Sequence, residues 1–239
     1  MSEEYSYIPN PSSFFLFAII TLYALFSYNM QEENFCLDEK SWRNGAFMIV
    51  YKEYNRARAV EYARRWALSR NPLFIDFAGR GGDCTNFVSQ CIYAGSCQMN
   101  FTTDFGWYYI NPNDRAPAWS SVEFLYDFLT GRADFMQMNG GIGPYGIEVD
   151  SLGAIEGDVV QLADESGDFY HTLIITGFSG GQTLVSAHTN DALDKPLSSY
   201  NFASLRYIHI EGVRIEVEDN DCFSELIDGV SLGIPQSTE

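Results

Sequence analysis

The sequence has few basic residues and few histidines. Lys and Arg total 14 against 32 Asp and Glu in 239 residues, which gives a formal net charge of −18 at pH 7. Nucleic-acid binding depends on Lys and Arg that neutralise phosphates, so this balance argues against a nucleic-acid-binding protein. Three histidines, His171, His188 and His209, are available for acid–base chemistry near neutral pH.

Closely spaced cysteine pairs are also absent. Five cysteines occur, and no two of them form a CxxC pair: Cys36, Cys84, Cys91, Cys97 and Cys222. An odd and sparse set does not fit a disulfide scaffold, and the lack of a short ligand pair disfavours a structural zinc site. We expect at least one thiol to be free or paired between chains.

Long apolar runs are limited to one, Phe14–Tyr28. It is shorter than the roughly 20 residues of a membrane span. Its upstream flank carries Glu3 and Glu4 and no Lys or Arg, unlike a cleavable secretory signal. The run is interpreted as a membrane anchor, a docked helix, or sequence upstream of a native start at Met48. A cytoplasmic protein is expected, with a membrane-anchored form as the alternative.

Helical patterns come first along the chain and strand patterns later. Apolar residues at helical spacing predict a helix over 53–68, a second from residue 84 and a short one near 121–129, before a glycine-rich stretch at 140–146. β-branched and aromatic runs predict strands at 158–162, 171–178, 183–188 and 206–210. This order indicates an α+β fold with an antiparallel sheet. We expect an N-terminal extension (1–47), one domain (48–212) and an acidic C-terminal extension (213–239).

The segment at 79–96 contains the most informative cysteine. Gly81 and Gly82 interrupt the chain, Asp83 is a typical helix N-cap, and Cys84 would open the helix. Helix N-termini lower a thiol pKa from near 8.5 to between about 3.5 and 7.5, and their free amides hold oxyanions. Cys84 is therefore the candidate nucleophile, and a small buried thiol is the alternative. Cys91 lies seven residues later on the same face and is interpreted as a core thiol.

Two histidines lie on a predicted hairpin at 169–191. A two-residue turn at 179–180 would place His171 opposite His188, and a turn at 180–181 would place it opposite Asn190. Either register puts these three side chains on one face, whereas a three-residue loop centred on Gly180 would put His188 on the other face. His171 is the candidate base and His188 the candidate orienting residue, with Asn190 or Asp191 as alternatives. His209 lies in a separate strand and is interpreted as structural.

Three segments, at 54–67, 81–95 and 157–191, carry a family resemblance. They resemble the putative amidase domain family, which belongs to the papain-like superfamily alongside bacterial cell-wall endopeptidases. The resemblance covers about residues 50 to 210. It implies a papain-like α+β fold with N-terminal helices packed on an antiparallel sheet. It also implies a nucleophile at Cys84, a histidine at His171 and a polar third residue most like His188.

The resemblance predicts a cysteine-dependent amide hydrolase that acts on a peptide or small amide, with a cell-wall peptide as one possible substrate and without metal or cofactor. The backbone amide of Cys84 would supply one oxyanion donor, with Tyr62 or Gln90 as a second. Trp107 and Tyr108 are candidates for a substrate groove, and core packing is the alternative for these aromatic side chains.

Two functions of other classes stay open. One is a catalytically inert binding module of the same fold. The other is a zinc site formed by Cys84, His171 and His188, a ligand combination that catalytic zinc sites use.

Overall fold

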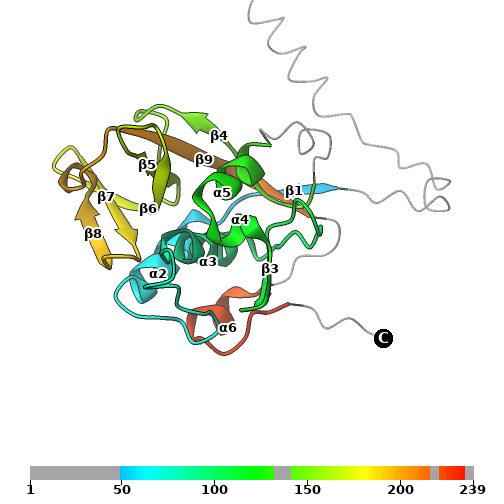
Figure 1. Ribbon diagram of the computed structural model, residues 1–239. Coiled ribbons are helices and arrows are strands. Elements are labelled where there is room, and N and C mark those ends of the chain that lie inside the picture. The colour runs from blue at the N-terminus through cyan, green and yellow to red at the C-terminus, as the bar shows by residue number, and fades with distance from the viewer. Residues whose placement is uncertain (1–48, 132–140, 216–220, 235–239) are drawn as a thin grey trace, which may run out of the picture. The chain divides into compact units, whose positions relative to one another are not determined.

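The computed structural model describes residues 49–131, 141–215 and 221–234 (Figure 1). The apolar run Phe14–Tyr28 lies outside these residues. The elements follow in the order β1 (Val50–Lys52), α2 (Arg56–Trp66), α3 (Cys84–Ser96), β2 (Tyr109–Asn111), β3 (Asp114–Arg115), α4 (Pro117–Ser120), α5 (Val122–Thr130), β4 (Gly143–Val149), β5 (Val159–Ala163), β6 (Phe169–Ser179), β7 (Gln182–Ala187), β8 (Ala192–Pro196), the 3-10 turn η2 (Leu197–Ser199), β9 (Ser204–Ile215) and α6 (Phe223–Ile227). Within the described part of the chain, no helix has both the length and the apolar character needed to span a membrane.

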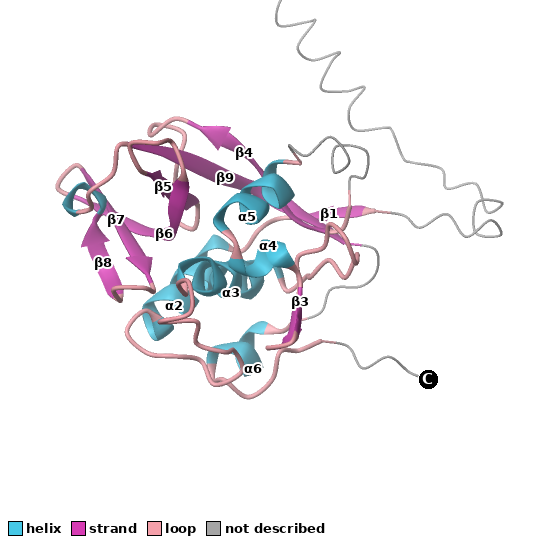
Figure 2. Ribbon diagram, viewed as in Figure 1, coloured by secondary structure: helices cyan, strands magenta, loops and turns pink. Residues whose placement is uncertain are grey.

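The centre of the fold is a curled antiparallel sheet of seven strands in the order β1-β9-β5-β6-β7-β8, with β4 paired to β9 as well. Helices α2 to α5 lie beside this sheet (Figure 2). Neighbouring strand residues face opposite sides: Val159 belongs to the core cluster shared with the helices, and Val160 belongs to a second cluster on the other face. The predicted α+β class with an antiparallel sheet is confirmed.

Helix α3 is the central helix, and all of its 13 residues are buried. The sequence pattern suggests that Gly95 ends this helix, but α3 continues to Ser96 and ends at Cys97, which has φ 50°. A Cβ on Gly95 would lie 2.3 Å from the ring of Tyr54 and 2.9 Å from the carbonyl of Asn55. Gly95 therefore lets the start of α2 approach α3 closely.

Strands β4 and β8 are not predicted, and β9 extends beyond its predicted end. Strand β4 begins inside the glycine-rich stretch, where a Cβ on Gly146 would lie 2.3 Å from the carbonyl oxygen of His209. The register between β4 and β9 shifts between Tyr145 and Gly146. Glycine here permits a bulge and a close backbone approach, as it does within strands elsewhere, so its presence does not signal a loop.

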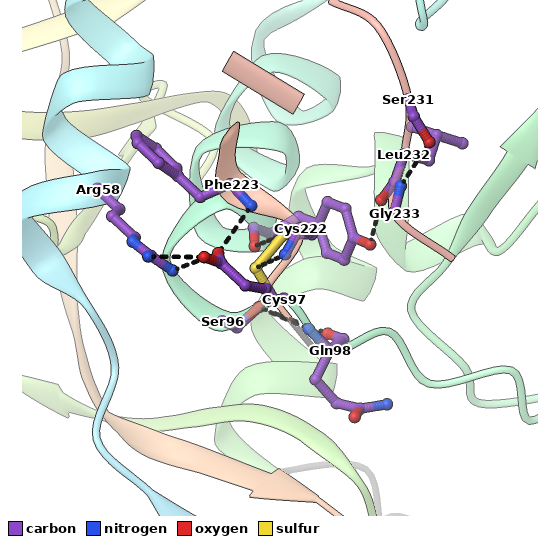
Figure 3. The surroundings of a disulfide bond; sticks show 11 residues. Arg58, Ser96, Cys97, Gln98, Cys222, Phe223, Ser231, Leu232 and Gly233 are labelled. Atoms are coloured by element: carbon purple, nitrogen blue, oxygen red, sulfur yellow. Dashed lines mark hydrogen bonds and ion pairs between the residues drawn. A yellow bond between two sulfur atoms is a disulfide. The ribbon is translucent and has the colours of Figure 1, made fainter. Parts of the chain in front are cut away.

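The described part of the C-terminal extension packs against the helices. Cys222 forms a disulfide with Cys97 at the end of α3, across a sequence separation of 125 (Figure 3). Residues further along accept hydrogen bonds from the helical layer: Trp66 Nε1 donates to Ile227 O at 3.0 Å, and Tyr93 OH donates to Leu232 O at 2.5 Å. The segment 221–234 therefore adds to the core and is not peripheral.

Candidate active site

Cys84 is the first residue of α3, at the predicted position. Gly81 and Gly82 precede it with φ of 107° and 110°, a region that side chains rarely adopt. The side chain is only 6% exposed. Burial raises the pKa of the Cys84 thiol, although hydrogen bonds from the backbone of Thr172 and the hydroxyl of Thr85 act in the opposite direction. The expected lowering of the pKa is therefore wrong, and the sulfur is a neutral thiol at pH 7.

The backbone N–H of Thr172, which acts on the pKa of the Cys84 thiol, lies beyond the end of β7. Ile175 directs its N–H toward β5, and amides three residues apart on an antiparallel strand point to opposite neighbours. The N–H of Thr172 therefore points toward β7. The ladder between these strands has its last pair at Ile174 and Ser186, so this amide is free to approach Cys84.

Asp83 occupies the N-cap position, but its side chain makes no capping hydrogen bond to α3. Its carboxylate accepts hydrogen bonds from the backbone of Phe77 at 3.0 Å and from Asn86 Nδ2 at 2.8 Å. Its other oxygen lies 2.6 Å from His188 Nδ1. The predicted capping role of this side chain is wrong, because the loop and the histidine use the carboxylate, and the first-turn amides of α3 stay uncapped beside Cys84.

His188 joins the start of α3 to the end of α2. Its Nδ1 lies 2.6 Å from Asp83 Oδ2 and its Nε2 lies 2.9 Å from the carbonyl of Trp66. Both partners are hydrogen-bond acceptors, so each ring nitrogen faces an acceptor. The ring also stacks on Phe87 with centroids 4.0 Å apart. His188 therefore fixes the loop before Cys84 and does not orient His171.

A bulge separates the two hairpin histidines. The turn lies at residues 180–181, one of the two predicted positions, but the register shifts between Ile175 and Gly177. One extra residue moves every later side chain to the other face. His171 consequently shares a face with Leu173 in the second core cluster, and His188 lies on the face of the helices. The predicted common face is wrong because sequence arithmetic assumes an unbroken ladder.

His171 lies on β6 directly before Thr172 and is buried. Burial lowers its pKa from 6.5 to about 4, and the cation of Lys195 contributes. Its ring lies beside Tyr170 and Tyr200, with centroids 6.2 and 5.8 Å apart. The structure gives this ring no hydrogen bond to any described residue, the thiol of Cys84 included. His171 is therefore a neutral imidazole, and the residue that follows it, Thr172, carries the backbone N–H that lies near the sulfur.

The alternative third residues are exposed, whereas His171 is buried. Asn190 is an exposed turn residue with φ 69°. Asp191 is exposed and pairs with both terminal nitrogens of Arg70 at 2.9 Å. Arg70 Nε also lies 3.5 Å from Asp83 Oδ2. Asp191 thus belongs to the charge network that surrounds Asp83.

The aromatic and oxyanion candidates lie in the core. Trp107 is fully buried and donates to Ser89 Oγ at 3.0 Å, so it cannot contact a substrate, and Tyr108 is half-buried. Tyr62 OH donates to Gln90 Oε1 at 2.8 Å. Gln90 is six residues along α3 from the nucleophile, a rise of about 9 Å. The expectation that Tyr62 or Gln90 supplies the second oxyanion donor is not met in this structure, because Tyr62 uses its hydroxyl proton on Gln90 and Gln90 lies well along α3 from Cys84.

Polar side chains that the sequence patterns did not single out lie next to Cys84. Thr85 Oγ1 lies 3.9 Å from the sulfur and 2.9 Å from Thr172 Oγ1. Gln161, on the neighbouring strand β5, donates to Thr172 Oγ1 at 3.5 Å. The available sequence signal was a polar residue inside each of two largely apolar strand runs, Gln161 and Thr172, and the structure buries both side chains fully.

The predicted zinc arrangement is not formed. Across the described ranges, no three or more His, Cys, Asp or Glu side chains gather into a group that could hold a metal ion. His188 points to Asp83 and Trp66, away from the face of His171.

Comparison with known proteins identifies the family. The model of a family described as "Putative amidase domain" matches residues 53–210. An uncharacterized protein, YhbB of Bacillus subtilis (strain 168), is 32% identical over 146 residues, which cover 59% of this chain and 43% of that protein. The chain thus spans less than half the length of this relative, and no solved structure matches. Because the family model covers most of the chain, this protein belongs to the putative amidase domain family.

Proposed function

We propose that this protein hydrolyses an amide bond with Cys84 as the nucleophile and His171 as the base. One observation supports this most strongly in a family described as an amidase: a buried thiol opens the central helix, beside the uncapped first turn of α3 and the N–H of Thr172. Amides that point at one position are typical of sites that stabilise a developing oxyanion. A papain-like mechanism and a peptide substrate of the cell-wall type are parts of the same proposal.

The reaction begins from a neutral thiol and a neutral imidazole. His171 takes the proton of Cys84 as the sulfur bonds to the substrate carbonyl carbon, and the oxygen becomes an oxyanion held by the backbone N–H of Cys84. The same imidazole then protonates the leaving amine as the C–N bond breaks. Water hydrolyses the thioester and returns the proton to the sulfur. His171 has to turn toward Cys84 for this step, and catalytic hydrogen bonds commonly tighten when substrate binds.

Mass spectrometry of a trapped acyl-enzyme tests the assignment directly. We expect a panel of peptidyl aminomethylcoumarin amides, quenched in acid during turnover, to leave an acyl group on Cys84. Cys84→Ala should lose the adduct, and Cys91→Ala, which removes the other free thiol of the described chain, should keep it. An adduct on Cys91, or equal adducts in both variants, would contradict the proposal. A Cys84 that iodoacetamide alkylates but no amide acylates would indicate the inert binding module.

The pH dependence of turnover follows from the buried histidine. Neutral His171 is required as a base, so activity should fall on the acid side with a midpoint near its pKa of about 4. The raised pKa of Cys84 keeps the thiol protonated well past neutrality, so kcat/KM should be level through pH 7. Lys195→Met removes the cation that disfavours imidazolium, so its acid midpoint should move to higher pH.

Arg65→Gln is the matched control, because Arg65 is an exposed cation over the ring of Trp66, and it should leave the acid midpoint where it is. An acid midpoint near 6.5 in the unmodified protein would show that the base is not the buried His171.

A further inference from the structure

A chain of buried polar groups links the sheet to the thiol. Arg206 Nε donates to Gln161 Oε1 at 2.7 Å, and Gln161 Nε2 donates to Thr172 Oγ1 at 3.5 Å. The hydroxyls of Thr172 and Thr85 lie 2.9 Å apart, and Thr85 Oγ1 lies 3.9 Å from the sulfur. All five side chains, Cys84 included, are less than 9% exposed.

The donor and acceptor groups of these side chains give the hydrogen-bond chain a direction. A guanidinium only donates, so Arg206 fixes the carbonyl oxygen of Gln161. The amide nitrogen of Gln161 also donates to the carbonyl of Val122 at 2.8 Å, which sets the same orientation. Thr172 Oγ1 therefore accepts from Gln161 and keeps its own proton to donate to Thr85. Thr85 can then donate its proton to Cys84.

We propose that Thr85 is a positioning residue for the Cys84 nucleophile, the last donor of a one-way hydrogen-bond chain that begins at Arg206 and ends at the sulfur. This inference rests on the proposed role of Cys84. The Thr85 hydroxyl points its proton at Sγ, where it stabilises negative charge as the thiol loses its proton. Thr172 contributes twice, since its backbone N–H approaches the sulfur and its hydroxyl holds Thr85 in the donor orientation.

Other charged groups around the thiol lie outside this hydrogen-bond chain. Asp83 and His188 pair with each other before α3, and His171 lies on β6 without a hydrogen bond to the sulfur. Arg206 pairs with Glu123 at 3.1 Å at the far end. A substitution at Thr85 leaves all of these groups in place, so a change in thiol titration would report the loss of the hydroxyl.

Alkylation of Cys84 by iodoacetamide, followed by mass spectrometry from pH 6 to 11, tests the proposal without any amide substrate. Hydrogen bonds to the charged form of a group lower the pKa of an acid. Thr85→Val should therefore move the alkylation midpoint up by about one pH unit. Thr172→Val should move it less and in the same direction. Thr85→Ser keeps the hydroxyl and should retain the original midpoint.

Thr176→Val is the matched control, because Thr176 lies on the same strand as Thr172 and its buried hydroxyl contacts Ser186 Oγ at 3.3 Å. The alkylation midpoint of Cys84 should not move in this variant. If Thr85→Val fails to fold, Thr172→Val with Thr172→Ser carries the test. Equal midpoints in the Val variants and the unmodified protein would overturn the proposal, as would the same shift in Thr85→Ser. Failure of the proposed function would look different: either no amide would acylate Cys84, or Cys84→Ala would still hydrolyse amides, whatever the alkylation midpoints are.

Discussion

Cys84→Ala is expected to lower kcat/KM for amide hydrolysis by at least about 10³-fold, because it removes the atom that forms the acyl-enzyme. Measured against the peptidyl aminomethylcoumarin amide that the unmodified protein cleaves fastest, the loss should fall on kcat. The substitution replaces a side chain that is already small and buried, so the far-ultraviolet circular dichroism spectrum should match that of the unmodified protein. Turnover that persists at the original rate would remove Cys84 from the mechanism.

His171 provides the second half of this prediction. His171→Ala should cost a similar factor, because the base and the nucleophile act as one unit and such losses are not additive. The double variant with Cys84→Ala should then be no slower than either single variant. His209→Ala is a suitable control, since His209 pairs with Asp158 at 2.8 Å and is assigned no catalytic role. Multiplicative losses in the double variant would show that the two residues act independently.

Local sequence patterns predicted the elements that carry the candidate site. Two glycines followed by a polar residue placed the start of α3 at Cys84, and a run of β-branched and aromatic residues placed β6 around His171. These features depend on conformational freedom and hydrophobic periodicity over a few residues. For the same reason, the turn of the hairpin at residues 180–181 was one of two positions that the sequence allowed.

The contacts between distant segments could not be predicted in this way. One bulge near Thr176 reverses the faces of the hairpin, and the adjoining Gly177 is compatible with a bulge but does not fix the register. Asp83 has the residue type of a helix cap, yet His188, 105 residues away, takes one of its oxygens. Tertiary packing decides the register of the hairpin and the hydrogen-bond partner of Asp83, and it overrides local sequence preference in both cases.

The pairing of Cys97 with Cys222 belongs to the same class of long-range contact. Five cysteines without a spacing pattern gave no reason to select this pair. In the structure, Cys97 follows the buried helix α3, and Cys222 precedes α6 in a segment beyond the matched family region. Disulfides persist in oxidising compartments, and the cytoplasmic location expected from the sequence stays a prediction.

Breaking this disulfide is expected to lower the free energy of unfolding by about 3 to 5 kcal/mol, because it closes a loop of 125 residues in the unfolded chain. Urea unfolding should show this loss in the double variant Cys97→Ser/Cys222→Ser, and in the unmodified protein treated with a reductant. The double variant is its own control, since the reductant should not destabilise it further. Segment 221–234 should also become sensitive to proteolysis first, because it then keeps only noncovalent contacts, such as those of Asp221 with Arg58 and of Ile227 with Trp66. Identical urea midpoints for the oxidised and reduced protein would show that the bond adds no stability.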